Sequence, residues 1–191
     1  MSAAQEILLL RHGMTPGNEL RQYIGRTDEP LSPAGRAALA ELRYPAAKVV
    51  YISPMLRCRQ TAEILFPGAE MRVCGDLQEM DFGHFEGRSA ADMEQDAEYR
   101  AWVDSYCEAP IPGGESRDAF MDRCCAAFER IVADDPSERL VFVVHGGTLM
   151  SILSRYAEPA REYYRWSPKN GHGFLLTREP GSLRLTLQKE L

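Results

Sequence analysis

The sequence lacks most features that would assign it to a specialised class of protein. No stretch of its 191 residues approaches the roughly 18 consecutive apolar residues of a membrane span. The formal net charge is −6 and no dense block of lysine and arginine is present, which argues against a nucleic-acid-binding surface. Because no basic residues precede the short apolar run near the N-terminus, we expect no secretory signal.

The cysteines and histidines lack the spacings of disulfide frameworks and metal sites. The five cysteines form no CxxC pair, and the four histidines form no HExxH motif. We therefore expect reduced thiols, no bound metal, no cofactor and a cytoplasmic location. Catalytic cysteine chemistry is the alternative, although nothing in the sequence around these cysteines supports it. The sequence does not indicate an oligomeric state.

The residues that are present predict a globular α/β protein. Hydrophobic residues make up 45% of the chain and charged residues 26%, and the length fits one domain over residues 1–191. Near-continuous apolar runs, which are typical of parallel strands covered on both faces, lie at residues 6–10, 48–52 and 139–144. Helical patterns lie at residues 33–43, 55–66, 116–134 and 147–157. This alternation predicts a three-layer α/β/α sandwich with a mainly parallel central sheet.

Two further segments complete the predicted fold. Residues 89–106 have the pattern of a helical insertion, and we expect a small helical cap over about 88–115. Residues 173–178 and 183–188, separated by Pro180-Gly181, predict a closing hairpin.

Each of the three apolar runs ends in polar residues. The first is followed by Arg11-His12-Gly13, the second by a segment that reaches Arg57, and the third by His145 and two glycines. Ligands of parallel α/β sheets bind at the carboxyl ends of the strands. If the three strands are parallel neighbours, two arginines and two histidines meet at one place.

These residue types suit phosphoryl chemistry. The planar guanidinium of Arg11 or Arg57 matches phosphate oxygens bidentately and neutralises charge in a transition state. A neutral imidazole is a competent nucleophile near pH 7, and neighbouring cations keep it unprotonated. A departing alkoxide needs a proton, for which the segment LQEMDFGHFEG offers Glu79, Asp81 and Glu86.

Six motifs together resemble the histidine phosphatase superfamily, also called the phosphoglycerate mutase-like family. In the family's order they are LLLRHGMTPGN, PLSPAGR, SPMLRCRQTAE, LQEMDFGHFEG, PGGES and VVHGG. The resemblance covers residues 6 to about 155. The stretch YIGRTDEPLSPAG further resembles the small phosphatase branch that contains the alpha-ribazole phosphatases.

The resemblance implies a role for each matching residue. His12 corresponds to the histidine that becomes phosphorylated, and Arg11 and Arg57 to the arginines that bind the phosphate. His145 corresponds to the second histidine, which contacts the phosphoryl group, and Glu79 to the usual proton donor.

Four further residues match substrate-binding positions, each with a structural alternative. Asn18 aligns with a phosphate-pocket residue or is a turn asparagine, and Thr15 contacts phosphate or stabilises the Thr-Pro-Gly turn. Gly25 falls where mutases line the substrate with backbone, although a loop also explains a glycine there. Gly146 offers its amide to phosphate or permits a tight turn.

Three departures from the family pattern bear on the reaction. Met14 stands where many members have glutamate or glutamine, and Ile24 where mutases often have a hydroxyl residue. The insertion between the acidic segment and the second histidine is shorter than in cofactor-dependent mutases, which favours attack by water on the phosphoenzyme.

The predicted function is therefore metal-independent hydrolysis of a small phosphorylated metabolite through a phosphohistidine, with alpha-ribazole 5'-phosphate as a candidate substrate. The alternatives are phosphoryl transfer of the phosphoglycerate mutase type and a non-catalytic protein that binds a phosphate ligand on the same fold.

Overall fold

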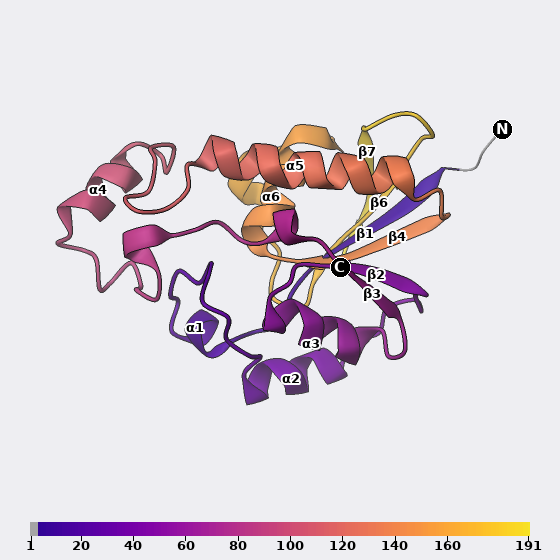
Figure 1. Ribbon diagram of the computed structural model, residues 1–191, viewed down its shortest axis with the longest axis horizontal. Coiled ribbons are helices and arrows are strands. Elements are labelled where there is room, and N and C mark those ends of the chain that lie inside the picture. Colours follow the sequence, from indigo (N-terminus) through magenta and orange to yellow (C-terminus); the bar gives the residue numbers. More distant parts are fainter. Residues whose placement is uncertain (1–3) are drawn as a thin grey trace.

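The computed structural model describes residues 4–191, and a seven-stranded sheet runs through its centre (Figure 1). The strand order across the sheet is β3-β2-β4-β1-β6-β7-β5. The strands are β1 (Gln5–Arg11), β2 (Val49–Ile52), β3 (Glu70–Val73), β4 (Arg139–Val144), β5 (Ala157–Glu158), β6 (Gly173–Arg178) and β7 (Leu185–Glu190).

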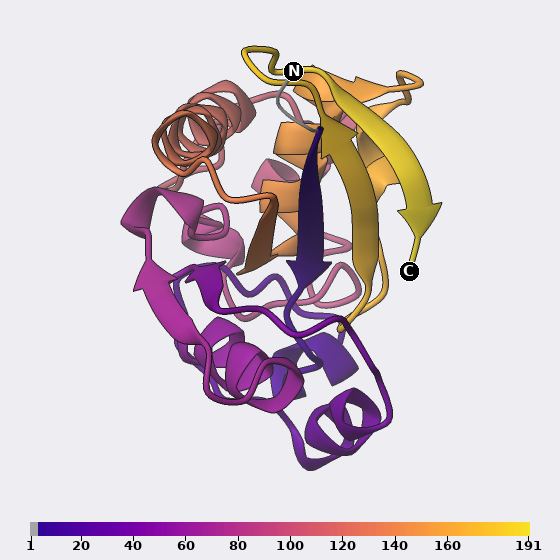
Figure 2. The same cartoon turned by 90° about the vertical axis from the view of Figure 1, so that its right-hand side faces the viewer.

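The three strands predicted from apolar runs are parallel neighbours, which is the condition for the polar residues at their ends to meet. β4 lies between β2 and β1 and is parallel to both. β6 is antiparallel to β1 and to β7, and Figure 2 shows this C-terminal pair beside β1. The prediction of a mainly parallel sheet is confirmed.

Helices cover both faces of the sheet, with α5 and α6 on one side and α2 and α3 on the other (Figure 1). The helices are α1 (Pro16–Glu19), α2 (Pro33–Ala40), α3 (Leu56–Leu65), α4 (Ala97–Asp104), α5 (Arg117–Asp134) and α6 (Gly146–Tyr156). Short 3-10 turns are η1 (Gly75–Leu77), η2 (Gly83–Phe85) and η3 (Tyr163–Trp166). The predicted three-layer α/β/α sandwich is confirmed.

The continuous apolar run of β1 follows from burial on both faces. Ile7 and Leu9 pack in the cluster beneath α5 and α6, whereas Leu8 and Leu10 pack in the cluster beneath α2 and α3. Successive side chains of a strand point to opposite faces, so both faces must be apolar. The same period of two puts Arg11 on the α6 face as the strand ends.

The predicted helix over 89–106 is wrong for its first half. Residues 89–96 form turns, and only Ala97–Asp104 is helical, as α4. The carboxylate of Asp92 accepts from the Ser89 amide at 2.8 Å, and Asp96 caps α4 by accepting from the Glu98 and Tyr99 amides. Such local side-chain bonds compete with helix formation. α4 projects beyond the end of the sheet (Figure 1).

Strand β3 gave no signal in the sequence. It lies at the sheet edge, and the side chain of Val73 is exposed. Its parallel pairing with β2 rests on backbone hydrogen bonds, which leave no apolar pattern. The C-terminal hairpin is confirmed as β6 and β7, with β7 beginning at Leu185 instead of residue 183.

Within residues 4–191, no helix is both long enough and apolar enough to cross a membrane.

We expect substitutions at the centre of the sheet to destabilise the fold more than substitutions at its edge. Phe142 of β4 is fully buried and packs on the rings of Tyr51 and Phe128, with centroids 5.4 and 5.6 Å away. We expect Phe142→Ala to lower the free energy of unfolding by about 3–5 kcal/mol in urea titrations, because it leaves a cavity. The matched control, Val73→Ala at the exposed edge, should change it by less than about 0.5 kcal/mol. Equal losses would contradict the assignment of the core.

Candidate active site

The register of the central strands brings the two predicted histidines together. Arg11 pairs with Val144, and the His12 amide donates to the Val144 carbonyl at 2.9 Å, so His12 and His145 leave adjacent strands side by side. Their ring centroids are 5.2 Å apart in an edge-on arrangement. The convergence expected from the strand ends is therefore present for both imidazoles.

His12 is held as a neutral ring with one free nitrogen. Its Nδ1 lies 2.7 Å from the carbonyl of Gly13, which can only accept, so Nδ1 carries the proton and Nε2 carries a lone pair. Burial lowers the pKa of His12 well below its ordinary value, and the positive charges of Arg57 and Arg11 lower it further. The ring therefore stays unprotonated at neutral pH.

The hydrogen bonds of His145 require the opposite tautomer. The Arg57 Nε–H group donates to Nδ1 at 3.3 Å, so the proton lies on Nε2 and donates to Ser53 Oγ at 2.7 Å. Burial and the charge of Arg57 lower the pKa of His145 well below its ordinary value. Ser53, which directly follows β2, thus fixes the orientation of the second histidine.

Arg57, from the first turn of α3, is 0% exposed, and each of its three guanidinium nitrogens donates a hydrogen bond. Besides its contact with His145, it donates to the carbonyls of Thr27 at 2.8 Å and Gly25 at 2.9 Å. Within residues 4–191 no carboxylate forms an ion pair with Arg57, so the peptide dipoles of the loop and the neutral imidazole stabilise its charge.

Arg11 reaches the same region from β1. Its Nη1 donates to the Pro168 carbonyl at 3.0 Å, while its buried Nε has no hydrogen-bond partner within residues 4–191. A side chain at Gly146 would begin 3.4 Å from this Nε, so Arg11 lies against the start of α6. An unpartnered buried donor here is suited to an anion.

Glu79 is a buried carboxyl at the same helix start. Oε2 accepts from the Gly147 amide and Oε1 from the Met80 amide, both at 3.0 Å. Burial raises the pKa of Glu79, and the two amides and both arginines only partly offset this. A carboxyl that keeps its proton more readily than usual is suited to act as a general acid.

The other two candidate acids have different partners. Asp81 accepts from the Gly83 amide at 3.0 Å and lies 3.5 Å from the Nε of Arg26. Glu86 accepts from the amides of Gly25 and Thr27, both at 2.9 Å, and so supports the loop that bonds to Arg57. Of the three carboxyls, Glu79 alone is among the residues that line the cavity described below.

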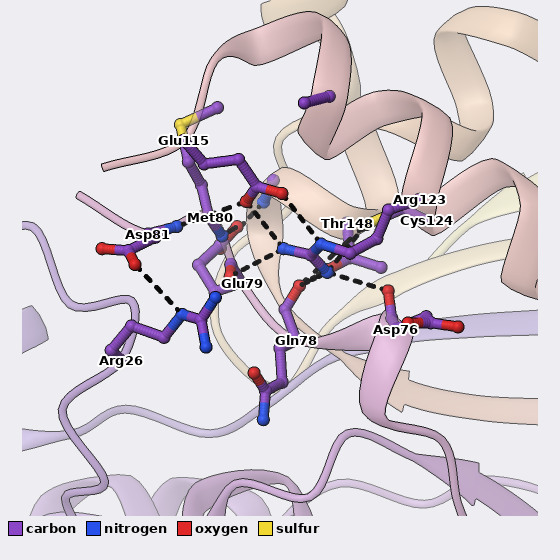
Figure 3. A network of polar contacts seen from close by, with 12 residues as sticks. Arg26, Asp76, Gln78, Glu79, Met80, Asp81, Glu115, Arg123, Cys124 and Thr148 are labelled. Atoms are coloured by element: carbon purple, nitrogen blue, oxygen red, sulfur yellow. Dashed lines mark hydrogen bonds and ion pairs between the residues drawn. The ribbon is translucent and has the colours of Figure 1, made fainter. Parts of the chain in front are cut away.

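A network around Arg123 of α5 holds the segment that carries Glu79 (Figure 3). Arg123 donates to the backbone carbonyls of Asp76, Gln78 and Glu79, and its guanidinium pairs with Glu115 at 2.8 Å. The three bonds to these carbonyls fix the course of the segment, and the pair with Glu115 orients the guanidinium that makes them. Sequence reasoning did not single out Arg123, because nothing local links position 123 to residues 76–79.

The four predicted substrate-binding residues have the following positions. The Thr15 hydroxyl caps α1 by accepting from the Asn18 amide, and Asn18 Oδ1 accepts from the Thr15 amide. The amide of Gly25 donates to Glu86 and its carbonyl accepts from Arg57, so both backbone groups have protein partners. Gly146 lines the cavity beside Arg11.

Asn170 is a further residue that sequence reasoning missed. Its Nδ2 donates to the carbonyl of His12 at 3.1 Å and to Asn18 Oδ1 at 3.0 Å, which ties the loop before β6 to the segment after β1. The bridge spans 158 positions in the sequence. No local pattern signals a contact over that separation.

A cavity opens beside Arg11 and Glu79. His12, Arg57 and His145 are buried and are not among the residues that line it, whereas Arg11 belongs to both the cluster and the lining. Its lining residues are Arg11, Tyr23, Glu79, Met80, Phe82, Trp102, Cys107, Arg117, Phe120, Gly146, Gly147, Met150, Tyr163, Tyr164 and Ser167. Within residues 4–191, no three His, Cys, Asp or Glu side chains are grouped to hold a metal ion.

The α/β/α fold and this histidine–arginine cluster define the class of protein. The model of the histidine phosphatase superfamily (branch 1) matches residues 7–190, and the chain belongs to this family of enzymes. The match extends past residue 155, where the sequence motifs ended.

Individual relatives are similar over most of the chain. Phosphoglycerate mutase-like protein 4 of Arabidopsis thaliana is 34% identical over 169 residues, which cover 82% of this chain and 73% of that protein. The metal-independent phosphoserine phosphatase of the same plant is 32% identical, covering 82% and 71%. The alpha-ribazole phosphatase from Shigella flexneri has a similar structure, with a TM-score of 0.83 and 25% identity over 97% of this chain and 96% of that chain.

The contact between Glu79 and α6 can be tested at Gly147. A Cβ atom there would lie 2.2 Å from Glu79 Oε1, so Gly147→Ala must displace the carboxyl. We expect the pKa of Glu79 to rise further, because the carboxyl stays buried and loses a donor that stabilises its anion. Titration of the side-chain carboxyl by ¹³C NMR measures this change.

Gly75→Ala is the matched control, because a Cβ atom at Gly75 meets nothing within 4 Å. It should leave the pKa of Glu79 unchanged. An unchanged pKa in Gly147→Ala would show that this amide does not stabilise the carboxylate.

Proposed function

We propose that the protein is a phosphomonoester hydrolase that works through a phosphohistidine at His12. In the first step Nε2 of His12 attacks phosphorus, the bond from phosphorus to the ester oxygen breaks, and Glu79 gives its proton to the departing alcohol. In the second step water attacks the phosphohistidine, the P–N bond breaks, and the Glu79 carboxylate takes the proton from water.

The observation that carries the proposal is a neutral imidazole with a free Nε2 beside two arginines and a second neutral imidazole. The arginines supply the positive charge that the transferring phosphoryl group requires. Arg11 has a buried donor to offer, whereas Arg57 would exchange its bonds to the loop carbonyls for phosphate oxygens.

One chemical argument and one comparison support hydrolysis without a metal. The roles of a metal in phosphoryl transfer, neutralising charge and orienting oxygens, are ones that guanidinium groups also perform. A relative that is 32% identical over 82% of this chain is named a metal-independent phosphoserine phosphatase.

The substrate we propose is a small phosphorylated metabolite. The names of the relatives point to phosphoserine, phosphoglycerate and alpha-ribazole phosphate. We favour alpha-ribazole 5'-phosphate because the similarity to the Shigella enzyme covers 97% of this chain and the stretch YIGRTDEPLSPAG also resembles that branch.

Replacing the nucleophile tests the proposal directly. We expect His12→Ala to lower kcat/KM for p-nitrophenyl phosphate by at least about a thousandfold and to abolish acid-labile labelling of the enzyme with phosphate. The matched control is His84→Ala, whose ring is exposed and pairs with Glu98 outside the site. It should retain full activity.

Two outcomes would contradict this reaction. Labelling that persists in His12→Ala would move the nucleophile elsewhere. Isomerisation of 3-phosphoglycerate with a bisphosphoglycerate primer, without release of phosphate, would identify a mutase.

The role of Glu79 as general acid can be tested with substrates that differ in their leaving group. We expect Glu79→Gln to slow hydrolysis of n-propyl phosphate by roughly a hundredfold or more, because an alkoxide must be protonated as it leaves. Hydrolysis of p-nitrophenyl phosphate should slow by less than about tenfold in the first step, since nitrophenolate leaves unprotonated. Asp81→Asn is the matched control. If it reproduced the selective loss, Asp81 would be the acid.

A further inference from the structure

The cavity beside Glu79 has an outer wall made largely of aromatic rings. Six of its lining residues are aromatic: Tyr23, Phe82, Trp102, Phe120, Tyr163 and Tyr164. They come from the segment after α1, the segment before η2, α4, α5 and η3. Regions far apart in the sequence thus contribute to one apolar surface next to the proposed acid.

The rings hold one another in place. Tyr23 packs edge-on against Trp102, with ring centroids 5.9 Å apart, and lies at a tilt against Phe82, with centroids 5.1 Å apart. The Tyr23 hydroxyl is bonded to the hydroxyl of Tyr99 at 2.9 Å, so its polar end already has a partner. A rigid wall of this kind presents ring surface at little entropic cost.

The lining contains few charged residues. Apart from Arg11 and Glu79, which the proposed reaction uses, the charged lining residue within residues 4–191 is Arg117. The Nη2 of Arg117 pairs with Glu108 at 2.6 Å, and its guanidinium lies 5.7 Å from the ring centroid of Tyr163. The buried Nε of Arg117 has no hydrogen-bond partner within residues 4–191. An ammonium group in this cavity would meet Arg117 and no carboxylate other than Glu79.

We propose that this cavity binds the alcohol part of the substrate and that the enzyme prefers phosphomonoesters whose alcohol carries a planar apolar ring. The inference rests on the proposed function, since it takes Glu79 as the group next to the ester oxygen. Aromatic walls bind such rings by burying apolar area and by edge-on and offset contacts. Zwitterionic alcohols such as that of O-phosphoserine are disfavoured because their ammonium group has no free carboxylate partner.

The test compares esters whose alcohols have similar acidity, so that the chemistry of the leaving group is matched. We expect kcat/KM for 2-phenylethyl phosphate to exceed that for n-propyl phosphate by at least about tenfold. It should exceed the value for O-phosphoserine by more than that.

Variants then locate the preference in the aromatic wall. Tyr164 lines the cavity but is 57% exposed, so its replacement should not prevent folding. We expect Tyr164→Ala to reduce the ratio of the two kcat/KM values several-fold and Tyr164→Phe to retain it. The matched control is Tyr106→Ala, at a tyrosine that is 83% exposed and is not part of the lining. It should leave the ratio unchanged.

The failure of this inference can be distinguished from that of the proposed function. Equal kcat/KM values for the two esters, or a preference for O-phosphoserine, would overturn the inference while hydrolysis itself is retained. The same ratio in Tyr164→Ala as in the unmodified enzyme would remove Tyr164 from the binding wall and overturn its part in the preference. Absence of hydrolysis of all esters, p-nitrophenyl phosphate included, would contradict the proposed function.

Discussion

The site depends on the burial of Arg57, which has no carboxylate partner in the part of the chain that the structure describes. Its guanidinium lies between the Nδ1 atom of His145 and the carbonyls of Gly25 and Thr27. Burial lowers the pKa of both imidazoles and the positive charge of Arg57 lowers it further, so both rings stay neutral. Glu86 accepts from the amides of the loop at 25–27 and so holds the loop whose carbonyls stabilise Arg57. The carboxylate of Glu86 thus supports the buried charge although it does not line the cavity.

Burial moves the proton affinities of the two proposed reacting groups in opposite directions. It lowers the pKa of His12 and raises that of Glu79, because in each case the charged form is the one that loses water. The result is an imidazole with a free lone pair beside a carboxyl that keeps its proton more readily than usual, and the proposed reaction requires this pairing. Arg123 and Gly147 keep the acid at the start of α6.

The central elements were predictable because their signals are local. The apolar runs of β1, β2 and β4 follow from burial on both faces, and Arg11, His12 and His145 follow those runs directly. The signal was misleading at residues 89–96, where Asp92 and Asp96 bond to nearby amides and end the helical pattern. It was absent for β3, whose exposed side chains carry no pattern.

The sequence by itself determined the layered α/β fold, the family and the types of residue available for chemistry, since periodicity and short motifs are properties of neighbouring positions. Only the tertiary structure decided which carboxyl faces the cavity, which nitrogen of each imidazole is free, and that Ser53, Asn170 and Arg123 position the site. These depend on hydrogen bonds and burial between residues tens to more than a hundred positions apart. Such contacts exist only after the strands have paired and the helices have packed.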